Sequence, residues 1–428
     1  MKLAGRISAA IEVLAEITGR NRPASEALKD WGKAHRFAGS TDRHVIGTLV
    51  FDALRHRNSA AAIGGSAEPR GLVLGTLVSV WNMPLAEIDA GCAEQFGPGA
   101  LLAEEKAALA KGLAADAPAS VRADFPSWLE PQLAEMFVSR LVEQMMALAQ
   151  RAPIDLRVNT LKATRGEVLA KFEKFGAAQT PLSPTALRIA APGIDVRNVN
   201  VEAEPAHGLG QFEVQDEASQ LAALLTGVKP GDTVLDLCSG AGGKSLALAA
   251  LMQNQGKLIA YDRDKHRLRP IFERIGRSGA SCIDVVPYDE PQKLSVAGGY
   301  DLVVVDAPCT GSGTWRRKPD AKWRLSEKQL TIRMKEQGDV LENAVQYVKR
   351  GGRLAYFTCS VLGAENSGQV AAFLKRHRDF QIIPYGQLWS AALPSAPPAS
   401  ADGRSDTLQL TPYSHGTDGF FIAVMVRS

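Results

Sequence analysis

The feature that most constrains the fold is a regular alternation of apolar strands and helical segments in the second half of the chain. From about residue 214 onward, the predicted strands are TVLDLC, KLIAYD, IDVVPYD, YDLVVVDAP and GRLAYFTC. Strands that are apolar along their whole length and alternate with helices are typical of a parallel sheet covered on both faces. In such sheets, ligands bind beyond the carboxyl ends of the strands. We therefore expect residues 214–428 to form an α/β domain with its functional site at that edge.

Two cysteines and an aspartate stand at these strand ends. Asp306 ends one strand, Cys309 follows three residues later, and Cys359 closes the strand GRLAYFTC. The 5 cysteines of the chain are scattered and odd in number, which argues against a disulfide framework. In a reducing compartment, which we expect to be the cytoplasm, such a cysteine is either a small buried residue or a nucleophile.

The first half of the chain has a different sequence pattern. A chain of 428 residues is long enough for two or three domains. Residues 1–130 are predicted to form a helical domain, because apolar residues recur at helical spacing in RISAAIEVLAEI, DRHVIGTLVFDALR and GLVLGTLVSVWNM. We expect Asp42 to cap the second of these helices. Residues 131–213 mix strand and helix patterns, and we expect a small α+β subdomain there. No apolar run approaches the roughly 18 residues of a membrane helix, so no membrane partner is expected.

A glycine-rich turn, VLDLCSGAGGKS, follows the first strand of the α/β domain. It fits neither the P-loop spacing nor the dinucleotide fingerprint, because required glycine positions hold Cys238 and Ser245. Asp262 ends the next strand, where an acidic residue can accept hydrogen bonds from ribose hydroxyls. Asp289 ends the third strand and is a candidate contact for an adenine amino group. Together these strand ends favour a cofactor that contains a nucleoside.

The residues 150–428 resemble the class I S-adenosylmethionine-dependent methyltransferases, and within them the RNA cytosine-5 methyltransferases of the RsmB/Sun/NOP family. The matching segments are LRVNTLK, GQFEVQDEAS, DLCSGAGGKS, AYDRD, DAPCTGSGTWRRKPDAKW, YFTCSVLGAENSGQV and GTDGFF. The resemblance implies a Rossmann-like, mainly parallel sheet, preceded by a small α+β RNA-binding insert. The helical region is similar to the NusB-like domain that some members carry. One departure is Ala241, which stands where the family usually has proline; it removes stiffness but no contact atom.

The resemblance also implies roles for the strand-end residues. Cys359 would attack carbon 6 of the cytosine, Cys309 would assist release of the product, and Asp306 would hydrogen-bond or protonate N3. The cysteine at 359 needs help to ionise, and the sequence leaves open whether a cation such as Lys244 or a helix N-terminus gives it. The implied cofactor is S-adenosylmethionine, and its predicted binding residues are Cys238, Ser239, Gly240, Ala241, Gly242, Gly243, Lys244, Asp262, Asp289 and Asp306.

The predicted partner is RNA, with rRNA ahead of tRNA. The run WRRKPDAKWR directly follows Cys309, and basic side chains bind phosphate while aromatic ones stack on exposed bases. The predicted RNA-binding residues are Arg316, Arg317, Lys318 and Trp323. A second basic run, RDKHRLRPIFERIGR, is interpreted as a solvated helix face. No Cys/His spacing indicates a metal site, and we expect a monomer.

Two alternatives remain at this point. A DNA cytosine-5 methyltransferase would use the Pro-Cys thiol as nucleophile, and Glu365 and Asn366 superficially fit its Glu-Asn-Val motif. That family has no reason to keep a Thr-Cys, however. A non-catalytic RNA-binding or ribosome-assembly factor is the other alternative, and the joint retention of Asp306, Cys309 and Cys359 speaks against it.

Overall fold

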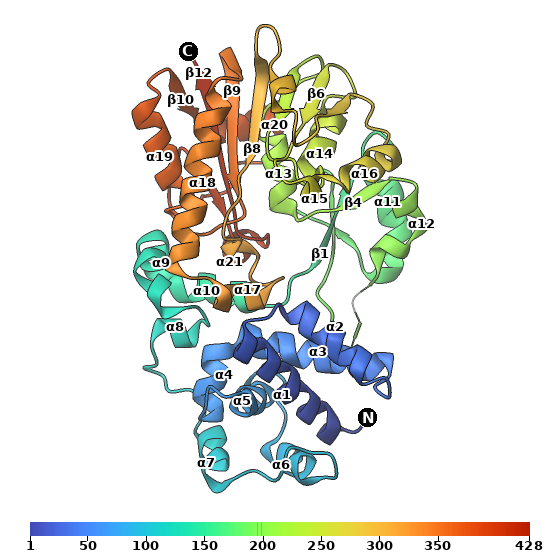
Figure 1. Cartoon of the computed structure of the whole chain (residues 1–428), viewed down its shortest axis with the longest axis vertical. Coiled ribbons are helices and arrows are strands. Elements are labelled where there is room, and N and C mark those ends of the chain that lie inside the picture. The colour runs from blue at the N-terminus through green and yellow to red at the C-terminus, as the bar shows by residue number, and fades with distance from the viewer. Residues whose placement is uncertain (195, 198) are drawn as a thin grey trace. The chain divides into compact units, whose positions relative to one another are not determined.

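The computed structural model describes residues 1–194, 196–197 and 199–428. The chain divides into two compact units, which are described separately below (Figure 1). The first consists of Met1–Arg151, Pro192–Asn198 and Trp315–Leu325, and the second of Ala152–Ala191, Val199–Thr314 and Ser326–Ser428. Among the described residues, no helix is long and apolar enough to cross a membrane.

The first unit is helical, as the sequence predicts. In α1 the buried side chains include Ile7, Ala10, Leu14 and Ile17, a spacing that places them on one face of the helix. They pack into a core with side chains of α3 and α5. The helices before the first strand are α1 (Leu3–Arg20), α2 (Ala24–Ala34), α3 (Ser40–Arg55), α4 (Arg57–Gly64), α5 (Pro69–Ser79), α6 (Leu85–Ala93), α7 (Ala103–Lys111), α8 (Ala119–Arg122), α9 (Glu130–Phe137) and α10 (Leu141–Ala149).

The expected role of Asp42 as a helix cap is wrong. Helix α3 begins at Ser40, so Asp42 lies in its first turn, and the residue before the helix is Gly39. The carboxylate of Asp42 instead accepts hydrogen bonds from the amino terminus of Met1, at 3.0 Å, and from Arg6, at 2.8 Å. These two cations, together with the positive N-terminal end of α3, account for the lowered pKa of the Asp42 carboxyl despite its partial burial.

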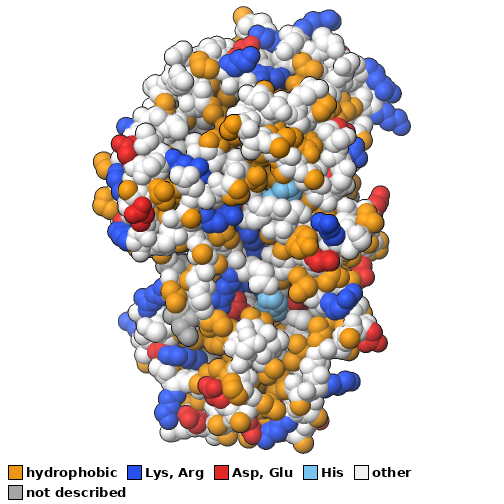
Figure 2. Space-filling model, turned by 180° about the vertical axis from the view of Figure 1, so that it is seen from behind, with side chains coloured by type: hydrophobic (Ala, Val, Ile, Leu, Met, Phe, Trp, Pro, Cys, Tyr) orange, Lys and Arg blue, Asp and Glu red, His pale blue; other side chains and the backbone are white. Residues whose placement is uncertain are grey.

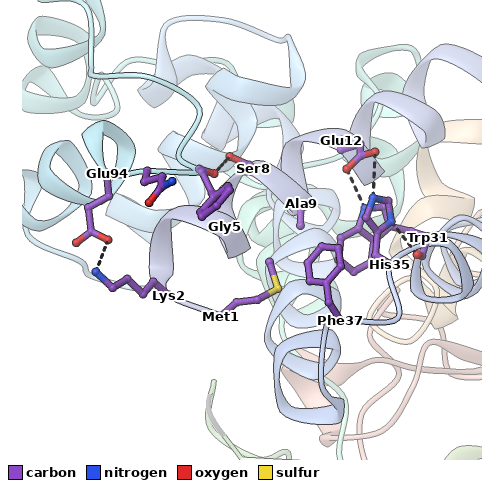
Figure 3. A pocket seen from close by; sticks show the side chains of 12 residues that line it. Met1, Lys2, Gly5, Ser8, Ala9, Glu12, Trp31, His35, Phe37 and Glu94 are labelled. Carbon is purple, nitrogen blue, oxygen red and sulfur yellow. Dashed lines mark hydrogen bonds and ion pairs between the residues drawn. The ribbon is translucent and has the colours of Figure 1, made fainter.

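The helical unit contains an apolar pocket of about 740 Å³ beside α1 and α2 (Figure 3). The rings of Trp31 and His35 stack there with their centroids 4.4 Å apart, and Glu12 accepts a hydrogen bond from the Trp31 indole at 2.9 Å. Phe37 and Phe96 line the same pocket with exposed fractions of 73% and 78%.

The second unit begins with the small α+β part that the sequence predicts. Its four-stranded sheet has the order β2-β3-β1-β4, and each neighbouring pair is antiparallel. Helix α11 packs on it through Val168 and Phe172. The elements are β1 (Ile154–Val158), α11 (Arg165–Phe172), β2 (Ala178–Gln179), β3 (Ala186–Ile189) and β4 (Phe212–Val214).

The main sheet of the second unit has the order β10-β12-β9-β8-β5-β6-β7, with β11 paired to β12 (Figure 1). The pairs among β5 to β9 are parallel, whereas β12 runs antiparallel to β9, β10 and β11. Strand β11 pairs with the amino-terminal part of β12, from Phe420 to Ile422. The strands are β5 (Thr233–Asp236), β6 (Lys257–Ala260), β7 (Ile283–Val285), β8 (Tyr300–Asp306), β9 (Val348–Thr358), β10 (Phe380–Ile383), β11 (Leu408–Leu410) and β12 (Phe420–Arg427).

Helices cover both faces of this sheet, which explains the continuously apolar strands. Successive residues of a strand point to opposite faces, so Leu302 and Val304 of β8 join one core while Val303 and Val305 join the other. The first core is closed by α13 (Glu217–Leu224), α14 (Gly243–Leu251), α16 (Ile271–Ser278) and α20 (Tyr385–Ala392), and the second by α18 (Glu327–Val345) and α19 (Ser367–Arg376). The chain order reverses at β5, which has β6 on one side and β8 on the other. Such a switch point is where an open α/β sheet binds its ligand.

Candidate active site

The carboxyl ends of β8 and β9 bring the two predicted thiols together. The strands are parallel neighbours, with Asp306 opposite Phe357, so the segments that follow them leave the same edge of the sheet. The Sγ atoms of Cys309 and Cys359 lie 3.3 Å apart, within hydrogen-bond distance for sulfur. Both side chains are only partly buried. The structure thus assembles the predicted pair from positions fifty residues apart in the sequence.

The electrostatics distinguish the two thiols. The pKa of the Cys309 thiol is raised well above its ordinary value, first by its hydrogen bond with Cys359 and then by burial. Negative charge on Cys359 and Glu365 raises this pKa further. The raised pKa favours the protonated form of Cys309, and either sulfur of the pair can be the hydrogen-bond donor.

Two glycines allow the backbone to cross close to Cys359. The Gly313 N–H donates to the carbonyl of Cys359 at 2.9 Å, and the Gly419 N–H donates to the carbonyl of Gly313 at 2.8 Å. A Cβ on Gly313 would lie 1.9 Å from the carbonyl oxygen of Gly419, so a side chain is excluded there. This crossing explains the glycines of the GSGT and GTDGFF segments.

Asp306 pairs with Lys244 of α14. The Lys244 ammonium donates to Asp306 Oδ2 at 2.7 Å and to Ser219 Oγ at 3.2 Å, and it lies 4.7 Å from the ring centre of Phe420. Lys244 was one candidate for helping Cys359 to ionise. In the structure its ammonium group forms an ion pair with the carboxylate of Asp306. Ser219 and Phe420 are site residues that motif reasoning missed, since neither residue type carries a recognisable signal alone.

The glycine-rich turn borders a pocket of about 200 Å³. The Gly240 N–H donates to Asp262 Oδ2 at 2.9 Å, which fixes the turn against the end of β6. Gly242 has φ 80°, in the left-handed region, and a Cβ there would lie 2.4 Å from Ile271 Cγ1. The pocket is lined by Leu237, Cys238, Tyr261, Asp262, Arg263, Arg267, Pro308, Glu336, Asp339, Val340 and Asn343.

This pocket fits a nucleoside-containing cofactor. The Oγ atom of Ser239, next to the lining residue Cys238, is buried and has no hydrogen-bond partner within the described part of the chain, although Ser239 itself is not among the lining residues. Asp262 is buried at the pocket wall, at the strand end where a carboxylate reaches ribose hydroxyls. Cys238 lines the pocket, and burial raises the pKa of its thiol, which keeps it neutral.

Asp236, at the end of β5, is a buried carboxyl next to this loop. Burial raises its pKa to about 7, and the nearby charge of Asp306 acts in the same direction. Its Oδ2 accepts a hydrogen bond from Ser245 Oγ at 2.6 Å. Ser245 thereby holds the end of β5.

Asp289 does not join the pocket. Strand β7 ends at Val285, so Asp289 lies in the following loop, where its side chain is exposed and is not among the lining residues. The far wall is formed instead by α18, with Glu336, Val340 and Asn343. The sequence predicts this helix but gives no signal for which of its residues reach the pocket, because that depends on the crossover from β8 to β9.

The basic run after Cys309 belongs to the helical unit. Residues Trp315–Leu325, including α17 (Pro319–Arg324), pack there, and Arg316 is only 5% exposed. Lys322 donates to the carbonyl of Arg55 at 2.9 Å, and the Trp323 indole N–H donates to the carbonyl of Leu54 at 2.5 Å. Arg317 is half-buried and Lys318 is exposed. Of the four predicted RNA-binding residues, Lys318 is thus the one on the open surface.

On the face drawn in Figure 2, the described Lys and Arg side chains are interspersed with hydrophobic and neutral ones, consistent with a net charge of +3. Among the described residues, no group of three or more His, Cys, Asp and Glu side chains is placed to hold a metal ion.

The sheet order, the glycine turn and the strand-end site define a class I methyltransferase fold. Residues 223–426 match the family model described as 16S rRNA methyltransferase RsmB/F, and residues 125–197 match the ferredoxin-like domain of the RsmF/B-like methyltransferases. The chain is 31% identical over 309 residues to the probable ribosomal RNA small subunit methyltransferase B of Synechocystis sp., covering 71% of this chain and 67% of that protein. It is 32% identical over 311 residues to the Bacillus subtilis protein of the same description, covering 70% and 66%. The chain belongs to the RsmB/F methyltransferase family.

Solved structures support the same fold. The crystal structure of PH0851 covers 99% of this chain and 98% of its own, with 26% identity and a TM-score of 0.73. The structure of NSun6 from Pyrococcus horikoshii with SFG covers 71% and 98%, with 20% identity and a TM-score of 0.61. The sequence alignments with the Synechocystis and Bacillus subtilis proteins extend over about two thirds of the length of each of those proteins.

Proposed function

We propose that the protein transfers a methyl group to carbon 5 of a cytosine in RNA, with ribosomal RNA as the substrate class. The observation that carries this proposal is the pair of thiols 3.3 Å apart, in which the pKa of the Cys309 thiol is raised. The relatives' description as small subunit rRNA methyltransferases supports the choice of rRNA. Carbon 5 of cytosine is a weak nucleophile, so the ring must first be activated by covalent addition.

Cys359 is the nucleophile in this account. The two sulfurs are within hydrogen-bond distance, and an S–H donated by Cys309 would stabilise the charge of a developing Cys359 thiolate. The thiolate adds to carbon 6, the carbon 5–carbon 6 double bond opens, and the electron pair is delocalised toward N3. Asp306 is proposed to interact with N3, and Lys244 orients its carboxylate. A cytosine must be unstacked to reach these groups.

Cys309 then assists release. The largest cause of its raised pKa is the hydrogen bond with Cys359, and the charge on Cys359 also contributes. Both disappear once the Cys359 sulfur is bonded to carbon 6, so Cys309 loses its proton to solvent more readily in the intermediate. As a thiolate it takes the proton from carbon 5, the double bond re-forms, and the Cys359 sulfur leaves.

S-adenosylmethionine, when bound, supplies the methyl group. The residues proposed to hold it are the turn 238–244, with Ser239 offering its unpaired hydroxyl, and Asp262. Asp289 and Asp306 remain proposed contacts, the first from an exposed loop. Lys318, with Arg316, Arg317 and Trp323 as its neighbours in the run, is proposed to contribute to RNA binding.

The test is methyl transfer itself. Purified protein and labelled S-adenosylmethionine are incubated with rRNA from a strain that lacks this gene, and bisulfite sequencing locates the product. We expect labelling of rRNA at one cytosine, none with Cys359→Ala, and none on DNA. Labelling of DNA alone would identify the DNA enzyme, whereas binding of rRNA without any transfer would identify an assembly factor.

A further inference from the structure

The segments that carry the two thiols converge on one buried carboxylate, that of Glu365. It lies between β9 and α19 and has an exposed fraction of 0%. Its Oε1 accepts the backbone N–H of Thr310 at 2.9 Å, and its Oε2 accepts the Thr310 hydroxyl at 2.5 Å. The same Oε2 accepts the hydroxyl of Ser360 at 2.5 Å. Thr310 directly follows Cys309 and Ser360 directly follows Cys359, so one side chain grips both thiol segments.

Glu365 is itself firmly held. The amide of Gln337, in α18, donates to Oε1 at 2.9 Å, and the hydroxyl of Tyr356 donates to the Glu365 backbone carbonyl at 2.6 Å. Every hydrogen bond that the described residues give to this carboxylate comes from an uncharged donor. Burial of a carboxylate is costly unless its oxygens are saturated with hydrogen bonds. A site that maintains this arrangement has a strict geometry, because a small displacement of either thiol segment leaves a buried oxygen unsatisfied.

Other hydrogen bonds join the two thiol segments only to each other. The hydroxyls of Ser312 and Ser360 are 2.9 Å apart, and the Gly313 N–H bonds to the Cys359 carbonyl at 2.9 Å. These contacts join the segments to each other, whereas Glu365 also ties them to α18 and to β9. The negative charge of Glu365 additionally acts on Cys309, whose pKa it helps to raise.

We propose that Glu365 is a positioning residue that sets the distance between the thiols of Cys309 and Cys359. For its catalytic meaning this inference rests on the proposed function. There, the distance between the thiols controls the passage from attack by Cys359 to release assisted by Cys309. Glu365 does not touch the base in this account. It acts through Thr310 and Ser360, so it differs from the carboxylate at N3, which is Asp306.

The distance can be tested without RNA or cofactor. Dibromobimane becomes fluorescent when two neighbouring thiols each displace one bromide, and peptide mapping then identifies the bridged pair. We expect the wild-type protein to form the Cys309–Cys359 bridge and Glu365→Gln to form it at least about tenfold more slowly. The amide places a donor against the hydroxyl donors of Thr310 and Ser360. Glu342→Gln is the matched control, because its carboxylate is 55% exposed and pairs with Arg376 and His377 on the surface; it should bridge like the wild type.

Two further measurements separate positioning from folding. In a Cys359→Ala background, Glu365→Gln should shift alkylation of Cys309 to lower pH, because one negative charge near the thiol is removed. In methyl transfer it should lower kcat by roughly 10²-fold with an unchanged KM for S-adenosylmethionine, the effect of a misplaced group. If Glu365→Gln does not fold, Thr310→Val and Ser360→Ala each remove one arm and should each slow bridging.

Bridging at the wild-type rate in Glu365→Gln, or in both single-arm variants, would overturn the proposal. Failure of the proposed function has a different signature: the wild-type protein would transfer no methyl group to RNA, while the bridging comparison among the variants would still decide the role of Glu365.

Discussion

Cys309 Sγ lies 3.3 Å from Cys359 Sγ, and this hydrogen bond is the largest cause of the raised pKa of the Cys309 thiol. In the proposed function the two residues have different tasks. Cys359 attacks the base, and Cys309 acts after the attack. The raised pKa of Cys309 depends on Cys359, so covalent bond formation at one sulfur changes the chemistry of the other.

The first prediction concerns the cofactor pocket. Asp262→Ala removes the acceptor of the Gly240 and Asp264 backbone N–H groups along with the proposed ribose contact. We expect the affinity for S-adenosylmethionine to fall by about 10- to 100-fold, the range for losing hydrogen bonds to a charged group. Isothermal titration calorimetry without RNA measures it. Asp289→Ala, in the exposed loop, is the comparison and should have the smaller effect; equal affinity of Asp262→Ala and wild type would remove Asp262 from the ribose site.

The second prediction divides the basic run. Lys318→Ala should weaken RNA binding and reduce the salt dependence of log Kd by about 0.7, the value for one phosphate contact on a single strand. Arg316→Ala should instead lower the melting temperature, because the Arg316 side chain is buried. Filter binding at several salt concentrations and thermal denaturation give the two readouts. An unchanged salt slope in Lys318→Ala would return this residue to an ordinary solvated position.

The third prediction uses Lys322, whose pKa burial lowers to about 8 from an ordinary value near 10.5. The charges acting on it are Asp124, which raises the pKa, and Arg55, which lowers it. The unfolded chain therefore binds more protons than the folded one between pH 8 and 10.5, so this group makes stability rise with pH across that window. Relative to Lys322→Met, the wild type should gain up to about 3 kcal/mol between pH 7 and 10.5.

Urea denaturation at both pH values measures this difference, and the Met variant cancels the contributions of other titrating groups. A constant difference between the two proteins across the window would show that Lys322 stays charged when folded.

The sheet and the thiol pair are predictable from sequence because both follow from strand periodicity. Apolar strands define the parallel core, and the carboxyl ends of neighbouring strands must lie at one edge, so Asp306, Cys309 and Cys359 converge. The same argument predicts that Asp262 lies at this edge of the sheet. Asp289 shows the limit of the strand-end argument. It lies in a loop, because β7 ends at Val285, earlier than the apolar sequence indicates.

The sequence does not predict that the basic run after Cys309 packs in the helical unit. The last carbonyls of α3 have no partner within the helix, and Lys322 and Trp323 satisfy those of Arg55 and Leu54. A run of charges carries no signal for such an acceptor, which lies 267 or 269 residues away along the chain. The same applies to Glu365, because its partners Thr310 and Ser360 are ordinary polar residues until the fold brings them together.

The most direct test of the central claim traps the covalent intermediate. Cys309→Ala is incubated with rRNA and S-adenosylmethionine and then run on a denaturing gel, beside Cys359→Ala and the double variant. We predict a protein–RNA conjugate in Cys309→Ala alone, because attack by Cys359 and methyl transfer proceed while release is blocked. A conjugate in Cys359→Ala but not in Cys309→Ala would contradict the account and make Cys309 the nucleophile. Full activity of both single variants, with no conjugate, would contradict covalent catalysis by either thiol.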